Sequence, residues 1–528
     1  MEPNEHTSLY NELQEFVRRT PPLRTLLADP HQTAIHLADA AVENPRLFHR
    51  LLLHYCLCGY AAGTFNTEQG PRSDAIALLE SGDRAGIAMM TEVGVSSSHS
   101  AIATEAHYRP QTHDFLLRTP QPEAGKFPTA AAATGVGTIA AVFARLIVDD
   151  RDCGVFTFIL DFSYPDRVPA GMDIRSRELR QGLDTSLAIV QFNDTVLPFN
   201  TWLSDGARME SDGTFHDRLD PPDRLRRTMS LGTHVWLAIT RAAAIVAQSA
   251  ANLALNYSLQ RALPRDRGTV FERPSHQLPL IDCIATATFL GHVRPTPTAT
   301  TSTQRAQDTT PWADVNADAA LCKALATVHS DRVVRRLRER CGAVAYASDG
   351  LFLDYLALTH GYFSAGGDNQ LILLDVGTRL AMADLADPTA PSASLDSLAD
   401  LANIAFRCEL RLRSNLAGGG ATSSDRIAIQ TADVYANRLQ MEQVSSLVDP
   451  DSLEGRLCYV HGLSWLLREA HILITAGALT SKDLATAQQR HERECAAIAK
   501  DIRALREHCE QWPIPDHPMG KDDYIAQL

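Results

Sequence analysis

A turn in the C-terminal half of the chain poses the plainest chemical question. The stretch GYFSAGGDNQLILL, residues 361–374, places two glycines before Asp368 and Asn369, and an apolar run follows. Asp and Asn side chains accept hydrogen bonds from the first free N–H groups of a helix, so the pattern predicts a helix start here. Gly366 offers no proton acceptor. A reaction at this turn that removes a proton would therefore need its base from another residue.

The cysteines do not suggest metal or disulfide chemistry. Ten cysteines are spread from Cys56 to Cys509, and only Cys56 and Cys58 lie close together. There is no CxxC pair, and no Cys/His cluster has the spacing of a zinc site. A chain of 528 residues is also too large to need disulfides for stability. We expect reduced, buried cysteines and no metal.

The composition excludes several classes of function. Hydrophobic residues make up 45% of the chain and charged residues 21%, as in ordinary soluble proteins. The 49 basic residues against 63 acidic ones give a net charge of -14, and the basic residues are scattered, which argues against nucleic-acid binding. The acidic N-terminus MEPNEHTSLYNELQEF lacks an apolar signal core. We expect a cytoplasmic protein without membrane insertion.

The first half of the chain changes from helical to strand-like patterning. Residues 1–85 carry apolar residues at helical spacing and are predicted to form an N-terminal helical domain. Residues 86–203 contain short runs such as IAAVFARLIV and VFTFILDF, rich in β-branched and aromatic residues and bounded by Asp, Gly and Pro. No helical pattern alternates with these runs. This zone is therefore predicted to be a mostly antiparallel β-barrel or sandwich.

The second half returns to helices. Residues 204–385 include the long run THVWLAITRAAAIVAQSAANLALNYSLQRAL, whose small residues would let neighbouring helices approach closely in a helical bundle. The segment RPTPTATTSTQ interrupts this zone and is predicted to be an exposed loop. Residues 386–528 are predicted to form a further helical domain. The fold class is therefore α+β, with four domains.

This order of zones, together with several motifs, resembles the acyl-CoA oxidase and dehydrogenase flavoprotein superfamily. The motifs are HYCLCGYAAGTFNTE, then MTEVGVSSS at the start of the strand zone, and LRERCGAVAY followed by GGDN. The resemblance is closest to the oxidase branch, whose members carry an extra C-terminal helical domain. It implies an FAD enzyme, typically a homodimer, that takes a proton from Cα and a hydride from Cβ of an acyl thioester. The thioester could be carried by CoA or by an acyl carrier protein.

The resemblance also implies a set of flavin-binding residues. The family motif Met-Thr-Glu-Leu-Gly-His-Gly-Ser-Asn corresponds to residues 90–98 here, and a Lys-Trp-Trp-Pro-Gly-Gly loop corresponds to KFPTAAAA, in which alanines replace the glycines. Short hydroxyl side chains suit a ring edge and a phosphate. Added Cβ atoms, by contrast, restrict φ. The cofactor-binding residues implied are Thr91, Gly94, Ser97, Lys126, Thr129, Arg261 and Asn369.

The resemblance sharpens the question posed by Gly366. The family reads Tyr-Glu-Gly-Asp-Asn where this chain has AGGDN, so Gly366 occupies the position of the catalytic glutamate. Some superfamily members carry the base near the start of the long helix instead, which corresponds to Val235 within a residue or so, beside His234. Histidine titrates near neutrality and could act as a base.

Three accounts of this glycine therefore stay open: a relocated base, altered chemistry, or lost catalysis. Other candidate bases lie in the segment before Gly366. The candidates are His234, His360, Asp354 and Tyr362.

Overall fold

The computed structural model describes residues 3–65, 73–95, 99–178, 183, 186–264, 267–295, 315–347, 350–382, 394–418 and 421–527. These residues pack into two compact units. Unit 1 takes its residues from Met1–Ala238, Thr310–Asn316 and Ser364–Gly366. Unit 2 takes its residues from Ile239–Thr309, Ala317–Phe363 and Gly367–Leu528. The predicted division into four domains stays a prediction, and the segment RPTPTATTSTQ lies almost wholly outside the described residues.

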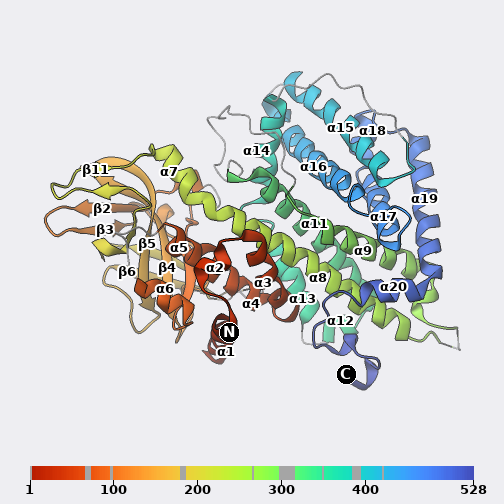
Figure 1. Cartoon of the computed structure of the whole chain (residues 1–528), viewed down its shortest axis with the longest axis horizontal. Helices are drawn as coiled ribbons and strands as arrows, with labels where there is room; N and C mark the ends of the chain where they lie inside the picture. The colour runs from red at the N-terminus through yellow and green to blue at the C-terminus, as the bar shows by residue number, and fades with distance from the viewer. Residues whose placement is uncertain are drawn as a thin grey trace. The chain divides into compact units, whose positions relative to one another are not determined.

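Unit 1 opens with a series of short helices (Figure 1). They are α1 (Pro3–Arg19), α2 (Leu23–Leu27), α3 (Pro30–Glu43), α4 (Pro45–Leu51), the π-helix η1 (Leu52–Gly59), α5 (Tyr60–Thr64) and α6 (Ser73–Glu80). Asp29 caps α3, because its carboxylate accepts a 2.8 Å hydrogen bond from the His31 N–H. Asn44 caps α4 in the same way, and in each case a proline opens the helix.

The strands follow where short β-branched runs predicted them, and they form a mixed seven-stranded sheet in the order β8-β3-β2-β4-β5-β9, with β1 also paired to β4. Its strands are β1 (Ala85–Met89), β2 (Glu105–Arg109), β3 (Asp114–Arg118), β4 (Gly137–Val148), β5 (Arg151–Ser163), β8 (Thr195–Pro198) and β9 (Trp202–Leu203). Two further hairpins are β6 (Met172–Glu178) with β7 (Ser186–Phe192), and β10 (Arg208–Met209) with β11 (Phe215–His216). Only β1 and β2 run parallel to β4, and the other paired strands are antiparallel.

The central hairpin shows how local sequence sets this register. Asp149 and Asp150 join β4 to β5, and both have positive φ, at 47° and 60°. Two such residues form the turn whose twist matches that of antiparallel strands. One face of the resulting sheet buries Phe115, Phe158 and Trp202 in an aromatic core.

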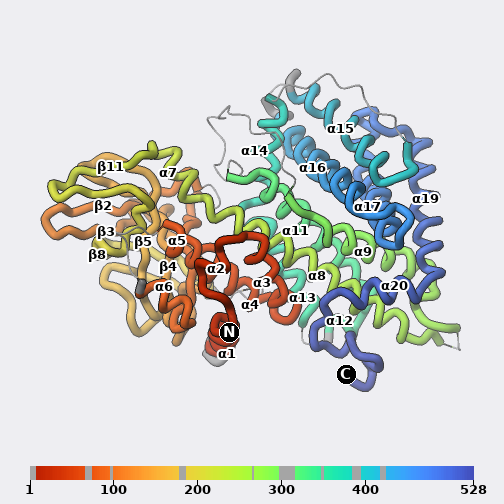
Figure 2. Tube along the Cα trace, viewed as in Figure 1, coloured from red at the N-terminus to blue at the C-terminus, as the bar shows by residue number. Residues whose placement is uncertain are grey.

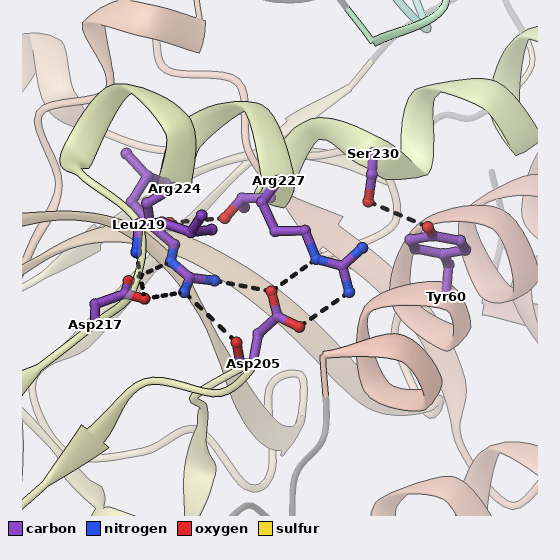
Figure 3. Close-up of polar contacts among 9 residues, drawn as sticks. Tyr60, Asp205, Asp217, Leu219, Arg224, Arg227 and Ser230 are labelled. Atoms are coloured by element: carbon purple, nitrogen blue, oxygen red, sulfur yellow. Dashed lines mark hydrogen bonds and ion pairs between the residues drawn. The ribbon is translucent and has the colours of Figure 1, made fainter.

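A buried ionic network joins the loops after β9 to α7 (Pro221–Thr228), as Figure 3 shows. Arg224 is 1% exposed and donates to Asp205 at 2.8 Å and to Asp217 at 2.6 Å. Arg227 donates to the same Asp205 at 2.9 and 3.0 Å. Each buried charge thus has a partner, which is the condition for tolerating charge away from water.

Unit 2 is helical (Figure 2). Its helices are α9 (Pro274–His292), α11 (Ala317–Cys341), α12 (Val344–Ala347), α13 (Leu351–Gly361), α14 (Asn369–Met382), α15 (Leu398–Gly418), α16 (Ala421–Ser445), α17 (Leu453–Arg468), α18 (Ala470–Thr475), α19 (Ser481–Lys500) and α20 (Ile502–Cys509). α9 packs against both α11 and α17. The boundary between the units falls inside the long helix α8 (Gly232–Gln260).

The helix α8 is long and apolar because it is a core helix. Pro221–Gln260 is sufficiently long and apolar to cross a membrane, yet 83% of its most apolar window is buried inside the structure. Its small residues permit close packing within unit 2, where the Ser330 hydroxyl reaches the Ala243 carbonyl at 2.7 Å. Both features are typical of a bundle helix in a water-soluble fold.

Candidate functional site

The two motif stretches predicted to contact a flavin are bonded to each other in unit 1. Backbone N–H groups of Phe127, Val93 and Gly94 donate to the carbonyls of Thr91, Gly125 and Glu123 at 2.8–2.9 Å. Gly94 also needs to be glycine, because a Cβ at this position would lie 2.6 Å from the Glu123 Cβ. The pairing places residues 91–94 beside residues 123–127, as two halves of one site would require.

A buried ion pair locks this pairing. Lys126 Nζ donates to Glu92 Oε1 at 2.8 Å, and the two side chains are 0% and 1% exposed. Thr104 and the Ala103 N–H also donate to the Glu92 carboxylate, at 2.6 to 2.9 Å. Burial lowers the pKa of Lys126 to about 8, although Glu92 opposes the shift. The Lys126 ammonium therefore has no surface left for a ligand, and it holds the motif together instead of contacting a flavin directly.

The hydroxyl side chains of the motif differ in their availability. Thr91 is half-buried, and within the described ranges its hydroxyl has no hydrogen-bond partner, so it is free to donate to a ligand. Thr129 lies 3.2 Å from His49 Nε2 and is already engaged. Ser97 lies outside the described residues. Thr91 is thus the one flavin-contact residue of this stretch whose hydroxyl the structure describes and leaves unpaired.

The alanine loop keeps a backbone suited to glycine. Ala130 has a φ of +71°, in the left-handed region that L-residues with a Cβ adopt at a cost of about 1–2 kcal/mol. Added Cβ atoms were expected to restrict this loop, since alanines stand where the resembled family has glycines. At Ala130 the backbone nevertheless adopts the left-handed conformation, with that loss of stability.

The turn at Gly366 is tied to the long helix by one hydrogen bond. Gly366 and Gly367 have positive φ, at 64° and 90°. The buried indole of Trp236 donates from Nε1 to the Gly366 carbonyl at 2.9 Å, and both residues belong to unit 1. The turn at the family's glutamate position is thus bonded to the residue that follows Val235, the position to which the alternative base of the resembled family corresponds. Neither glycine nor valine carries a proton acceptor.

His234 points away from that meeting point. Its Nε2 lies 3.0 Å from the Leu27 carbonyl, so this nitrogen carries the proton, and Nδ1 is a buried acceptor without a partner among the described residues. Burial lowers the pKa of His234, which favours the neutral ring. Residues two apart on a helix lie about 200° around its axis, so His234 and Trp236 face opposite sides of α8. The His234 ring can therefore accept a proton, but it does not point toward Gly366.

The other candidate bases lie on α13 or just after it, in unit 2. His360 is 65% exposed at its side chain and lies 3.8 Å from the Asp331 carboxylate. Asp354 is half-buried in the first turn of α13, and Tyr362 is 1% exposed. Their predicted catalytic role stays a prediction.

A buried lysine that sequence reasoning missed holds the second glycine of the turn. Lys323 on α11 is 0% exposed, and its Nζ donates to the Gly367 carbonyl at 2.5 Å and to Asn369 Oδ1 at 2.9 Å. The Asn369 amide in turn donates to Thr327 at 3.0 Å, so both its oxygen and its nitrogen form hydrogen bonds within the fold, and its predicted contact with a flavin stays a prediction. Burial lowers the pKa of Lys323 to about 7. The only sequence signal was a single lysine inside the apolar run AALCKALATV.

Arg261 is placed as a ligand-binding arginine would be. It follows α8, its side chain is exposed, and in the part of the chain that the structure describes its guanidinium has no hydrogen bond or ion pair. Its backbone N–H donates to the Tyr257 carbonyl and its backbone carbonyl accepts from the Val270 N–H, each at 2.9 Å. An unpaired guanidinium is suited to a phosphate group.

Comparison with known proteins gives a consistent picture. Residues 231–381 match the family model of the acyl-CoA oxidase C-alpha1 domain. A peroxisomal acyl-coenzyme A oxidase 2 of Arabidopsis thaliana is 25% identical over 391 residues, which cover 70% of this chain and 56% of that protein. An acyl-coenzyme A oxidase of Saccharomyces cerevisiae is 37% identical over 120 residues, or 22% of this chain and 16% of that protein. The chain thus spans little more than half of the curated relatives it matches.

Solved structures share the fold over almost the whole chain. The crystal structure of acyl-CoA oxidase 1 from Yarrowia lipolytica superposes with a TM-score of 0.79 at 17% identity, covering 99% of this chain and 85% of that one. Acyl-CoA oxidase-1 of Caenorhabditis elegans, solved with FAD and ATP, gives a TM-score of 0.77 at 18% identity, with coverage of 99% and 85%. The predicted α+β fold with a strand region between helical regions is confirmed.

Proposed function

Because the chain belongs to the acyl-CoA oxidase/dehydrogenase superfamily, we propose that it is an FAD-dependent oxidoreductase acting on an acyl thioester. The observation that carries the proposal is the hydrogen-bonded pairing of residues 91–94 with residues 123–127, which leaves the Thr91 hydroxyl unpaired. The thioester would be carried by CoA or by an acyl carrier protein. The relatives named as acyl-CoA oxidases favour CoA.

The residues present suit FAD in part. Thr91 offers a free hydroxyl for the edge of the flavin ring, and Arg261 offers an unpaired guanidinium for a phosphate. The resemblance assigns a further hydroxyl to Ser97. Bound FAD would supply the acceptor for a hydride. Lys126 and Asn369 would act indirectly, because their polar groups are used to hold the motif stretch and the turn before α14.

The chemistry would differ from ordinary α,β-desaturation of an acyl chain. That reaction needs a positioned base at the Cα proton, and such a base typically contributes about 100- to 10,000-fold to the rate. Gly366 provides no carboxylate, and Trp236 beside it provides no acceptor. We therefore infer a substrate whose oxidation does not depend on a base at this position.

Cofactor binding gives the first test. The purified protein should be yellow, or should take up added FAD with a change in the flavin absorption spectrum. Replacing Thr91 by valine removes the hydroxyl while keeping the shape, and it should weaken FAD binding by roughly tenfold. Thr112 on an exposed loop gives a matched control, because Thr112→Val should leave FAD binding unchanged. Colourless protein that takes up no FAD would contradict the proposal.

A second candidate function is that of a catalytically silent homologue, which binds an acyl ligand or pairs with an active subunit. It is supported by Gly366 and Val235, which stand at the two base positions that the resemblance implies and carry no proton acceptor. The two functions differ in one measurement. An active enzyme that has bound FAD will lose its flavin absorption when mixed anaerobically with its substrate, whereas a silent homologue will bind acyl-CoA without bleaching.

We also propose a homodimer, as the resemblance implies, with a cytoplasmic location. Light scattering during size-exclusion chromatography would give the mass of the particle, against 57.7 kDa for one chain. Some relatives are named as peroxisomal, so a fluorescently tagged full-length chain should be followed against a peroxisomal marker. A monomer, or co-localisation with that marker, would contradict these two proposals.

A further inference from the structure

A hollow in unit 2 is lined by arginines. It lies among α9, α11 and α17 and has a volume of about 250 Å³. Four arginines and two carboxylates line it, which sums to +2. The charged lining residues are Arg332, Arg335, Arg336, Arg468, Asp282 and Glu339.

Spacing on α11 brings three of these arginines to one side of the helix. Residues three and four apart on a helix are neighbours on its surface, and Arg332 is followed at those distances by Arg335 and Arg336. Arg468 is the last residue of α17. α9 packs against both helices, so its residue Asp282 lies in the same hollow.

Two of the four arginines are already neutralised. Arg335 pairs with Asp331 at 3.0 Å, and Arg336 pairs with Asp282. Asp282 also bonds His491 and Ser464, and these donors and Arg336 hold its pKa at about 2. The Asp282 carboxylate is therefore ionised and hydrogen-bonded to three donors; its charge also favours the Arg468 cation, but it forms no ion pair with Arg332 or Arg468 among the described residues.

Arg332 and Arg468 are the arginines left over. Among the described residues, neither makes a hydrogen bond or an ion pair through its guanidinium. Arg468 is accessible to water and yet surrounded by protein, as a side chain lining a hollow should be, and this burial together with the charge of Arg332 lowers its pKa. Two like charges that disfavour each other beside a hollow are stabilised by an anion between them.

Carboxylates lie near the two arginines without pairing with them. The C-terminal end of α17 favours a cation, which accounts for a positive charge at Arg468 but not for Arg332 facing the same hollow. Burial, with a contribution from Glu469, raises the pKa of Asp433 to about 6, so its carboxylate is still mostly ionised at pH 7. Within the described part of the chain, however, neither Asp433 nor Glu339, which lines the hollow, forms an ion pair with Arg332 or Arg468. His329, which also lines the hollow, is kept neutral because burial lowers its pKa to about 3.

We propose that Arg332 and Arg468 form a binding site for a phosphate-type dianion. Guanidinium groups bind phosphate oxygens through two parallel hydrogen bonds, which a chloride ion cannot reproduce. The volume of about 250 Å³ lies below the roughly 300–1,000 Å³ of pockets for drug-sized ligands, so it fits one phosphate group and not a whole nucleotide. The group could be free phosphate or the phosphate end of a larger molecule.

The test is calorimetric titration of the full-length protein with inorganic phosphate, at constant ionic strength maintained with chloride. We expect saturable binding that weakens about tenfold or more in Arg332→Ala and in Arg468→Ala. Arg335→Ala is the matched control within the hollow, because that arginine already has a carboxylate partner. Arg503→Ala, on the exposed side of α20, controls for total charge. Circular dichroism of each variant verifies folding, and Arg332→Lys retains the charge if alanine is not tolerated.

A second titration with glycerol phosphate in place of inorganic phosphate shows whether the bound phosphate group is a free ion or the end of a larger molecule. Tighter binding of the ester indicates the phosphate end of a larger molecule, whereas tighter binding of inorganic phosphate indicates the free ion, and both outcomes support the site. Absence of saturable phosphate binding would overturn the proposal. An equal loss of affinity in Arg503→Ala would also overturn it, because the binding would then reflect net charge alone.

Discussion

The indole Nε1 of Trp236 donates to the carbonyl of Gly366 at 2.9 Å, across 130 residues of sequence. This bond joins the first turn of α8 to the turn before α14. The resemblance places the superfamily's catalytic glutamate at Gly366 and its alternative base at Val235, the residue before Trp236. A hydrogen bond between two uncharged groups therefore lies where a carboxylate would be expected.

Restoring a carboxylate at this turn should restore proton abstraction, at some cost in stability. Gly366 has a φ of +64°, so any side chain introduced there loses about 1–2 kcal/mol of stability. Gly366→Glu and Gly366→Gln share that cost and nearly the same shape, but only glutamate can accept a proton. We expect saturated acyl-CoAs to bleach the flavin about 100-fold faster or more in Gly366→Glu than in Gly366→Gln. Equal rates in the two variants would show that the acyl site no longer reaches residue 366.

The unmodified protein should bleach slowly in the same experiment, and His234→Ala should not slow it further. The reason is that His234 faces Leu27, on the side of α8 opposite to Trp236. Rapid bleaching that disappears in His234→Ala would instead identify His234 as a relocated base.

Removing one member of the buried pair of Lys126 and Glu92 should lower the stability of the protein strongly, whereas replacing both members by uncharged residues should lower it little. Lys126→Met leaves the Glu92 carboxylate buried without its cation, for which a loss of about 3–5 kcal/mol is expected. The double variant Lys126→Met with Glu92→Gln should recover much of that loss, because no unpaired charge remains. Urea denaturation followed by circular dichroism measures both. The exposed pair of Arg175 and Asp173 is the control, and Arg175→Met should change the midpoint little.

Lys323 should make the stability of the protein rise with pH. Its pKa is about 7 in the folded chain, against 10.5 for an ordinary lysine, so between these values the unfolded chain binds more protons than the folded one. The contribution of Lys323 to stability then increases from about pH 7 toward pH 10.5. Lys126, whose pKa is also lowered, and the buried cysteines, whose pKa values are raised, contribute to the same profile, so the test is the difference in urea midpoint between the unmodified protein and Lys323→Met across the window. Lys482→Met, at an exposed position on α19, should leave the pH dependence unchanged, and equal pH dependence in Lys323→Met and the unmodified protein would contradict the assignment.

Ala130→Gly should stabilise the protein or leave it unchanged. Glycine removes a left-handed strain of about 1–2 kcal/mol and adds a smaller entropic cost in the unfolded chain. Ala131→Gly is the matched control, since Ala131 is buried without a positive φ and should lose about 0.5–1 kcal/mol. Thermal unfolding of the two variants gives the comparison. Equal destabilisation of both would mean that the loop does not hold Ala130 in the left-handed region in solution.

Much of the fold could be predicted from short-range patterns. The runs IAAVFARLIV and VFTFILDF became β4 and β5, because β-branched and aromatic residues on either side of two turn-forming aspartates specify a hairpin locally. The helix start at Asp368 followed from its capping chemistry, and Asp368 Oδ1 accepts from the Gln370 N–H at 2.8 Å. α13 was not predicted as a separate helix, because its residues show no apolar face of helical period.

The site was harder to predict, because its contacts join residues distant in sequence. Lys126 was singled out as part of a flavin-contact loop, which stays a prediction; its partner Glu92 lies 34 residues away, and the burial of both is a property of the folded sheet. Lys323 reaches Gly367 across 44 residues. A motif gives the type of side chain at each position. The direction in which that side chain points depends on the residues, distant in sequence, that pack against it and bury it.

The cysteines have a practical consequence for following the unfolding of this protein. All ten thiols are buried, and burial raises the pKa of each, so the reactive thiolate is scarce in the folded chain. Cys56, Cys58 and Cys153 belong to unit 1, and the remaining seven belong to unit 2. Each thiol therefore reacts with an alkylating reagent only when the structure around it unfolds. Pulsed alkylation read by mass spectrometry would time the opening of the two units separately, without any introduced label.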